Sequence, residues 1–232
     1  MNGIASDELI GTWVKGWAEA RGFDTYHEGP VHAYRRTGQD EAHWEYVVHE
    51  PDNELLQKLA HMMREHSGQR LTVFTEDPDS MPEKVHEVGL RVVANREVMM
   101  TSPIAAHDVE APLTEDSLVW QEKRDGAHTW VSLHRREDGA VLASGHMASI
   151  GDYAVFDRIV TAPDQRRKGY GTLVTRYLAS VATETDAEYG LLVASTDGYE
   201  LYHHLGWTLL GAMLAIETPE EADDTARIDH TS

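Results

Sequence analysis

The sequence contains no cysteine among its 232 residues. This absence excludes disulfide bonds, thiolate metal sites and a cysteine nucleophile. There is also no uninterrupted apolar run of 18 residues, so no segment is predicted to span a membrane as a helix. The first residues, MNGIASDELIG, have neither the basic nor the apolar region of a signal peptide. We therefore expect a soluble, cytoplasmic protein.

Basic residues are scarce: 20 Lys and Arg stand against 40 Asp and Glu, which gives a net charge of −20. Such a charge repels phosphate backbones, so we expect no nucleic-acid partner, and no membrane partner either. It would attract cationic substrates such as amines, although weakly at physiological salt. An acidic surface that serves only solubility is the alternative explanation. The hydrophobic fraction of 41% suffices for a sizeable core, in one domain or two.

Apolar spacing predicts an α/β (α+β) protein whose two halves repeat a similar order of elements. In the first half, helices are expected at residues 7–21, 53–66 and 82–88. Strands are expected there at 31–36, 43–49, 70–75 and 90–100, the last as one strand or a hairpin. In the second half, strands are expected at 118–121, 129–134, 141–150, 153–161, 190–194 and 207–216. Helices are expected there at 172–183 and 199–205.

Two short segments point to an internal duplication. Residues 46–52 (YVVHEPD) resemble residues 158–164 (RIVTAPD), and each is followed by a helix, a short strand and a helix that ends at Gly89 or Gly206. Because each match is short, chance similarity is the alternative. A linker is expected near 103–112, which divides the chain into domains 1–105 and 106–220. Residues 221–232 are expected to form an acidic, flexible tail.

The most informative segment is IVTAPDQRRKGYGTLVTRYL, residues 159–178. A predicted strand enters a turn at Pro163, and the basic residues Arg166, Arg167 and Lys168 precede two glycines and a predicted helix. Backbone amides at a helix start are unpaired, and the helix dipole favours an anion there. Glycines let the main chain approach that anion closely. The segment therefore predicts a binding site for a diphosphate.

These residues resemble the GNAT superfamily of N-acetyltransferases. One signature is Arg166-x-x-Gly169-x-Gly171 between strand and helix, with Pro163 before it, and a second is Leu201-Tyr202-x-x-x-Gly206-Trp207. The resemblance covers about 141–217, and it reaches the first half only through the internal repeat. It implies a mixed central sheet flanked by helices, in two pseudo-repeated halves of the acyl-CoA N-acyltransferase fold.

The resemblance also implies acetyl-CoA as cosubstrate, in a gap between the strands at 153–161 and 190–194. Main-chain groups of Ile159, Val160 and Thr161 would pair with the pantetheine arm. The amides from Arg166 to Thr172 would bind the pyrophosphate, and this loop comprises Arg166, Arg167, Lys168, Gly169, Tyr170, Gly171 and Thr172. Many members place an asparagine after the later strand, where this chain has Ser195 instead.

Tyr202 resembles the general acid of the family, since a phenol can protonate the departing thiolate. Its alternative role is packing under the Gly206 turn. The attacking amine needs a base or a water relay, for which His146 and Asp157 are the candidates, with Ser149 as an anchor for water. Asp157 could instead simply pair with Arg158.

Without cysteine, a covalent thioester enzyme is excluded, and direct attack in a ternary complex is expected. The acceptor is expected to be a primary amine of a small-molecule or amino-acid-like compound. A protein acceptor is one alternative, and a non-catalytic acyl-CoA-binding or regulatory module is another. The chain would be a monomer or a homodimer.

The first half has no glycine pair after Pro51, and Glu50 and Glu54 would repel a phosphate there. Val85 occupies the place of Tyr202. We expect this half to bind no acetyl-CoA, and to be structural or to form a wall of the acceptor pocket. No metal is expected, because the histidines show no recognisable ligand spacing. In the first half, His61 and His66 are five residues apart and so not on one helical face, and the others are scattered: His27, His32, His43 and His49.

Overall fold

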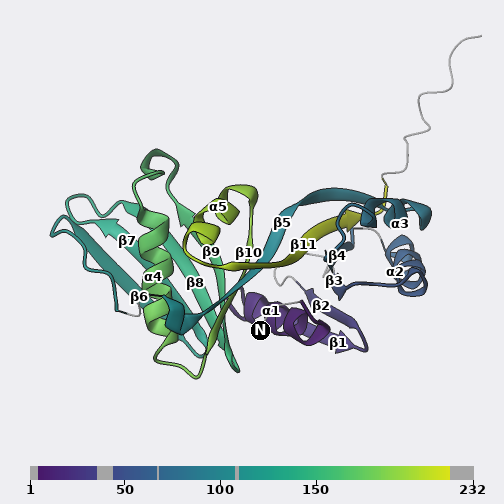
Figure 1. Cartoon of the computed structure of the whole chain (residues 1–232), viewed down its shortest axis with the longest axis horizontal. Coiled ribbons are helices and arrows are strands. Elements are labelled where there is room, and N and C mark those ends of the chain that lie inside the picture. The colour runs from purple at the N-terminus through teal and green to yellow at the C-terminus, as the bar shows by residue number, and fades with distance from the viewer. Residues whose placement is uncertain (1–4, 36–43, 67, 108–109, 220–232) are drawn as a thin grey trace, which may run out of the picture.

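The computed structural model describes residues 5–35, 44–66, 68–107 and 110–219, which build an 11-stranded sheet (Figure 1). In order across the sheet, the strands are β1 (Asp24–Glu28), β2 (Val31–Arg35), β3 (Trp44–His49), β4 (Arg70–Thr75), β11 (Thr208–Glu217), β5 (Arg91–Pro103), β10 (Tyr189–Ala194), β9 (Tyr153–Thr161), β8 (Val141–Ile150), β7 (His128–Arg135) and β6 (Leu118–Asp125). The helices are α1 (Asp7–Glu19), α2 (Asn53–Glu65), α3 (Met81–Glu87), α4 (Tyr170–Ala182) and α5 (Thr196–His204), with short 3₁₀ turns η1 (Ile104–Ala106) and η2 (Pro163–Gln165). The predicted mixed sheet flanked by helices is confirmed.

The two halves of the chain repeat one arrangement, as β3–α2–β4–α3–β5 and as β9–α4–β10–α5–β11. In each, the first two strands pair in parallel, while the other neighbouring strands are antiparallel. The last strands are exchanged: β5 of the first half pairs with β10, and β11 of the second half pairs with β4. Each half therefore completes the sheet of the other.

The ends of α3 and α5 match bond for bond. The amide of Leu90 donates to the Val85 carbonyl at 3.1 Å, and the amide of Trp207 donates to the Tyr202 carbonyl at 3.0 Å. The intervening Gly89 and Gly206 have φ of 76° and 85°. This left-handed glycine closes a Schellman-type helix end in both halves. Val85 is thus the structural counterpart of Tyr202, as the sequence repeat predicted.

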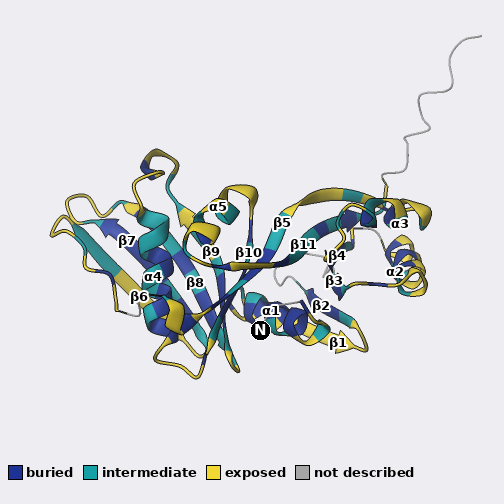
Figure 2. Ribbon diagram, in the orientation of Figure 1, coloured by how far each residue is buried: buried dark blue, intermediate teal, exposed yellow. Residues whose placement is uncertain are grey.

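Helices cover both faces of the sheet. Along β10, Leu192 packs with α4 and α5, while the preceding Leu191 packs in the cluster formed by α1. Because successive strand residues point to opposite faces, α1 lies on the face away from α4. It crosses the junction of the halves, with contacts to β8 and β9 as well as β2 and β3 (Figures 1 and 2). We call this side of the sheet the α1 face.

Several elements differ from the sequence predictions. α5 begins three residues before the predicted start at Tyr199. β5 is one strand of 13 residues, which is the first of the two predicted alternatives. β1 was not predicted, because all five of its residues are exposed and lack an apolar alternation.

The boundary expected after residue 105 falls within η1, and the division into domains stays a prediction. The acidic tail lies outside the described residues. In the described part of the chain, no helix is long and apolar enough to cross a membrane.

Candidate active site

A bulge in β9 opens the sheet between β9 and β10. The two strands pair in parallel from Tyr153 opposite Tyr189 to Phe156 opposite Leu192, and no farther. At the bulge, Arg158 has φ of 47°, and the pairing with β8 shifts register between Ser144 and His146. Beyond Phe156, β9 pairs only with β8, through residues 157, 160 and 161. The predicted gap between two splayed parallel strands is therefore present.

The loop after β9 borders this gap. Arg167 and Gly169 have φ of 63° and 82°, the left-handed conformation that occurs in anion-binding loops of the backbone. Gly169 occupies the N-cap position of α4 but has no side chain, and among the described residues no side chain caps the first amides of the helix, so we call this start uncapped. A Cβ on Gly171 would lie 3.3 Å from Leu201 Cδ2 and 3.5 Å from Thr161 Oγ1. Such close approach and free donors suit a diphosphate.

These groups line one cleft of about 640 Å³ between β9, α4 and α5. It brings together most of the residues predicted to bind acetyl-CoA: Ile159, Val160, Thr161, Arg166, Arg167, Gly169, Tyr170, Gly171, Thr172 and Ser195. Lys168 does not line the cleft, because its Nζ donates to Gln165 Oε1 at 2.9 Å. Asp197, Gly198, Glu200 and Leu201 also line it and were not predicted. They belong to the first two turns of α5, whose start the sequence placed too late.

Tyr202 reaches the same cleft from the buried side of α5. Its side chain is 7% exposed and packs against Trp207, with ring centroids 5.7 Å apart. Burial raises the pKa of the Tyr202 phenol well above its usual value, and the negative charge of Asp157 adds to the shift. The phenol is therefore protonated at neutral pH. Ser195 serves as the N-cap of α5, where its Oγ accepts from the Gly198 amide at 3.3 Å.

Asp157 lies on the α1 face and is held by two arginines. Arg21, just after α1, donates to both carboxylate oxygens at 3.0 Å, and Arg158 Nε lies 3.2 Å from Oδ2. Arg158 also donates to the Ala20 carbonyl. The bidentate pair fixes the end of α1 beside the gap. Arg21 was not predicted as part of this site, because 136 residues separate it from Asp157 in the chain.

His146, the other candidate base, stands opposite Asp157 on β8. Its Nδ1 lies 2.9 Å from His128 Nε2 and 3.1 Å from Arg158 Nη2. Because the guanidinium can only donate, Nδ1 accepts and the neutral ring carries its proton on Nε2. Burial lowers the pKa of His146 to about 4, and the charge of Arg158 adds to this effect. Ser149 pairs with Ala154 on the opposite face, so it does not adjoin His146.

The depressed pKa of His146 makes stability depend on pH. Above about pH 6.5 the ring is neutral in both folded and unfolded chains and contributes nothing. As the pH falls toward 4, the unfolded chain takes up the proton first, so folding loses about 3 kcal/mol. Urea unfolding at pH 7 and pH 4 should show that His146→Gln removes this part of the acid destabilisation.

His61→Gln is the control for that experiment, since His61 is a largely exposed histidine on α2. It should leave the pH dependence of the wild type unchanged. If His146→Gln lost as much stability as the wild type between the two pH values, the burial of a neutral imidazole at this position would be contradicted.

The corresponding place in the first half is closed. β3 and β4 stay paired through His49 opposite Phe74, and the Glu50 amide then donates to the Phe74 carbonyl at 3.0 Å. The Glu50 carboxylate accepts hydrogen bonds from the Thr75 hydroxyl at 3.1 Å and from the amide of Glu76. Asp52 caps α2, accepting from the Leu55 amide at 2.8 Å. The chain's own carboxylates thus occupy the positions that a diphosphate would need.

Three potential metal ligands meet at the other end of α1. Ligand atoms of Asp7, His27 and His32 lie within 4.8 Å of one another. The Asp7 carboxylate is 3.2 Å from His32 Nε2, and the two imidazoles stack at 4.6 Å. The sequence did not predict this cluster, because β1 was not predicted. Its pairing with β2 places His27 opposite His32. His43 lies outside the described residues, and the absence of a metal stays a prediction.

The parallel strand pair that opens beyond a bulge, beside a helix start without a side-chain cap, is the geometry that the sequence resemblance implied. Residues 96–207 match the model of the acetyltransferase (GNAT) family. The chain therefore contains a GNAT acetyltransferase domain over these residues. No curated protein matches the chain.

Solved structures resemble the chain over nearly its whole length. A GCN5-related N-acetyltransferase from Kribbella flavida has a TM-score of 0.66 at 13% identity, covering 94% of this chain and 97% of its own. A tandem GNAT protein from the clavulanic acid biosynthesis pathway has a TM-score of 0.59 at 11% identity, covering 95% and 91%. A putative acetyltransferase of the GNAT family from Novosphingobium aromaticivorans has a TM-score of 0.55 at 14% identity, covering 90% and 96%. At these identities the likeness establishes the fold.

Proposed function

We propose that this chain transfers an acetyl group from acetyl-CoA to the primary amine of a small-molecule or amino-acid-like acceptor. The observation that carries the proposal is the single cleft in which the uncapped start of α4, the free edge of β9 and the phenol of Tyr202 meet. The family match supports acyl transfer in general. The net charge of −20 supports a cationic amine as the acceptor, and its identity as a small molecule or an amino-acid-like compound is part of the proposal.

Acetyl-CoA supplies the activated acetyl group when bound. The amides around Gly169 and Gly171 would hold its diphosphate, assisted by Arg166 and Arg167 at the rim of the cleft. The main chain of Ile159 to Thr161, unpaired on the side of β10, would hold the pantetheine arm as an added strand. These contacts would place the thioester at the opening beyond Phe156.

The chemical step follows from this placement. The neutral amine attacks the thioester carbonyl carbon, so that a C–N bond forms and the C–S bond breaks. The sulfur takes the proton of the Tyr202 phenol. The nitrogen loses one proton to a base or a water relay, which returns a proton to the phenolate, so the phenol is protonated again at the end of the cycle. His146 and Asp157 stay candidate bases, although two arginines engage Asp157 and the Nδ1 atom of His146 accepts from His128 and Arg158. Positioning in a ternary complex supplies the main acceleration.

Free thiol release from acetyl-CoA, measured with a panel of primary amines, tests the proposal. Amine-dependent release with intersecting double-reciprocal plots is expected, since both substrates must be bound together. Calorimetric binding of acetyl-CoA without turnover on small amines or amine-bearing peptides would favour the alternative, a non-catalytic acyl-CoA-binding module. Turnover confined to peptides would indicate a protein acceptor.

A further inference from the structure

A carboxylate from the first half of the chain stands at the end of the opened strand. β10 pairs with β5 up to Ala194 opposite Val98, and Glu97 is the next residue of β5. After Ala194 the chain leaves the sheet, because Ser195 caps α5 and the Thr196 hydroxyl donates to the Arg96 carbonyl at 3.3 Å. Glu97 therefore has β11 on one side and the end of β10 on the other.

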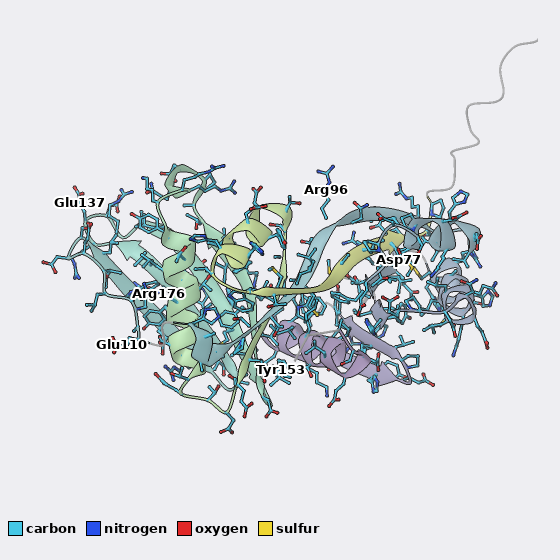
Figure 3. All side chains as sticks on the ribbon, viewed as in Figure 1. Asp77, Arg96, Glu110, Glu137, Tyr153 and Arg176 are labelled. Atoms are coloured by element: carbon cyan, nitrogen blue, oxygen red, sulfur yellow. The ribbon has the colours of Figure 1, made fainter. Side chains whose placement is uncertain are left out.

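The side chain of Glu97 belongs to the α1 face. It pairs across the sheet with Met213, and it lies two residues from Met99, both of which pack in the α1 cluster. The preceding Arg96 extends from the face of β5 that is turned away from α1 (Figure 3). Alternation along a strand then directs Glu97 to the α1 face. Asp157 reaches the same face from β9.

Glu97 is a half-buried carboxylate that has no hydrogen-bonding or ionic partner among the described residues. Burial alone raises its pKa above the usual value for glutamate. Asp157, in contrast, has both oxygens bound by Arg21. A half-buried, unpaired carboxylate carries a desolvation cost that a cationic ligand would offset. Among these two acids, Glu97 is thus the one with its oxygens available to such a ligand.

The cleft and Glu97 lie on the two sides of one opening. The cleft is bounded by α4 and α5, so acetyl-CoA would enter from their face of the sheet. An acceptor must then approach the thioester from the other face, since the pantetheine arm would fill the first. The acceptor would then reach the thioester from the α1 face, between β9 and β5.

We propose that Glu97 binds the ammonium group of a cationic acceptor, such as an aliphatic diamine, and so orients it toward the thioester. This inference rests on the proposed function. It gives the first half a direct part in the site of the second half, through the exchanged strand β5. It also assigns the proposed preference for a cationic acceptor to one carboxylate, that of Glu97, rather than to the net charge of the chain.

Titration calorimetry with 1,4-diaminobutane on CoA-saturated protein tests this proposal directly. The wild type should bind the diamine, and Glu97→Gln should weaken binding by about 10- to 100-fold, the usual effect of losing a hydrogen bond to a charged group. Glu97→Gln should bind acetyl-CoA as the wild type does, which also shows that it is folded. The exposed Glu87 of α3 provides the matched control, Glu87→Gln, which should bind the diamine normally.

Two outcomes would overturn the assignment of Glu97. The first is a diamine affinity that is equal in the wild type and Glu97→Gln, and the second is a wild type that does not bind the diamine at all. Failure of the proposed function has a different signature. In that case the diamine binds through Glu97, but no thiol is released from acetyl-CoA.

Discussion

Replacing Tyr202 by phenylalanine is expected to lower kcat by about 10²- to 10⁴-fold, while acetyl-CoA still binds. The substitution removes only the hydroxyl of a side chain that is 7% exposed and packed against Trp207. Its burial keeps the phenol protonated, as a proton donor must be, and proton transfer by a positioned side chain contributes an acceleration of that size. Steady-state thiol release with a saturating amine measures kcat, and calorimetry measures acetyl-CoA affinity.

Tyr199→Phe is the matched control, because Tyr199 lies on the same helix, stacks on His203 and does not line the cleft. It should retain wild-type kcat. A Tyr202→Phe variant with kcat within threefold of the wild type would show that Tyr202 only packs under the Gly206 turn. The proton for the thiolate would then come from another source.

Replacing Gly171 by aspartate is expected to weaken acetyl-CoA binding by at least about 100-fold. A side chain there would start 3.3 Å from Leu201 and 3.5 Å from Thr161, at the wall of the cleft. The carboxylate would add negative charge beside the amides that should bind the diphosphate, and the two like charges would repel each other. Calorimetric titration with acetyl-CoA gives the affinity, and the thermal shift that acetyl-CoA produces should vanish.

Gly171→Asn separates charge from size, since asparagine is nearly isosteric with aspartate. It should weaken binding less than Gly171→Asp does, and the difference should shrink at high salt. Wild-type affinity in Gly171→Asp would mean that the diphosphate does not lie against this loop. Equal losses in both variants would assign the whole effect to steric exclusion.

The parts of the site that the sequence predicted are local. The loop from Arg166 to Thr172 and the helix that carries Tyr202 each follow from residues close together in the chain. Glycine spacing and turn chemistry determine such segments wherever they occur. The parallel pair β9 and β10 follows as well, because a single helix connects the two strands.

The parts that the sequence missed depend on long-range pairing. Asp157 meets Arg21 across 136 residues, and Glu97 reaches the opening only because β5 is exchanged between the halves. No spacing in the sequence encodes either contact. Asp7, His27 and His32 likewise meet only once α1 packs against the hairpin of β1 and β2. From the sequence, the first half was expected to be structural or to form a wall of the acceptor pocket. No residue was indicated for that wall, and both alternatives stay predictions.

Counting the acetyl-CoA molecules bound per chain tests the central claim, that the fold is repeated but the binding site is not. The second half has an opened strand pair and an uncapped helix start, whereas Glu50 and Asp52 close the first half. Titration calorimetry should give one acetyl-CoA per wild-type chain, and none for Gly171→Asp in the same concentration range. Two molecules per chain, or one that persists in Gly171→Asp, would contradict the account.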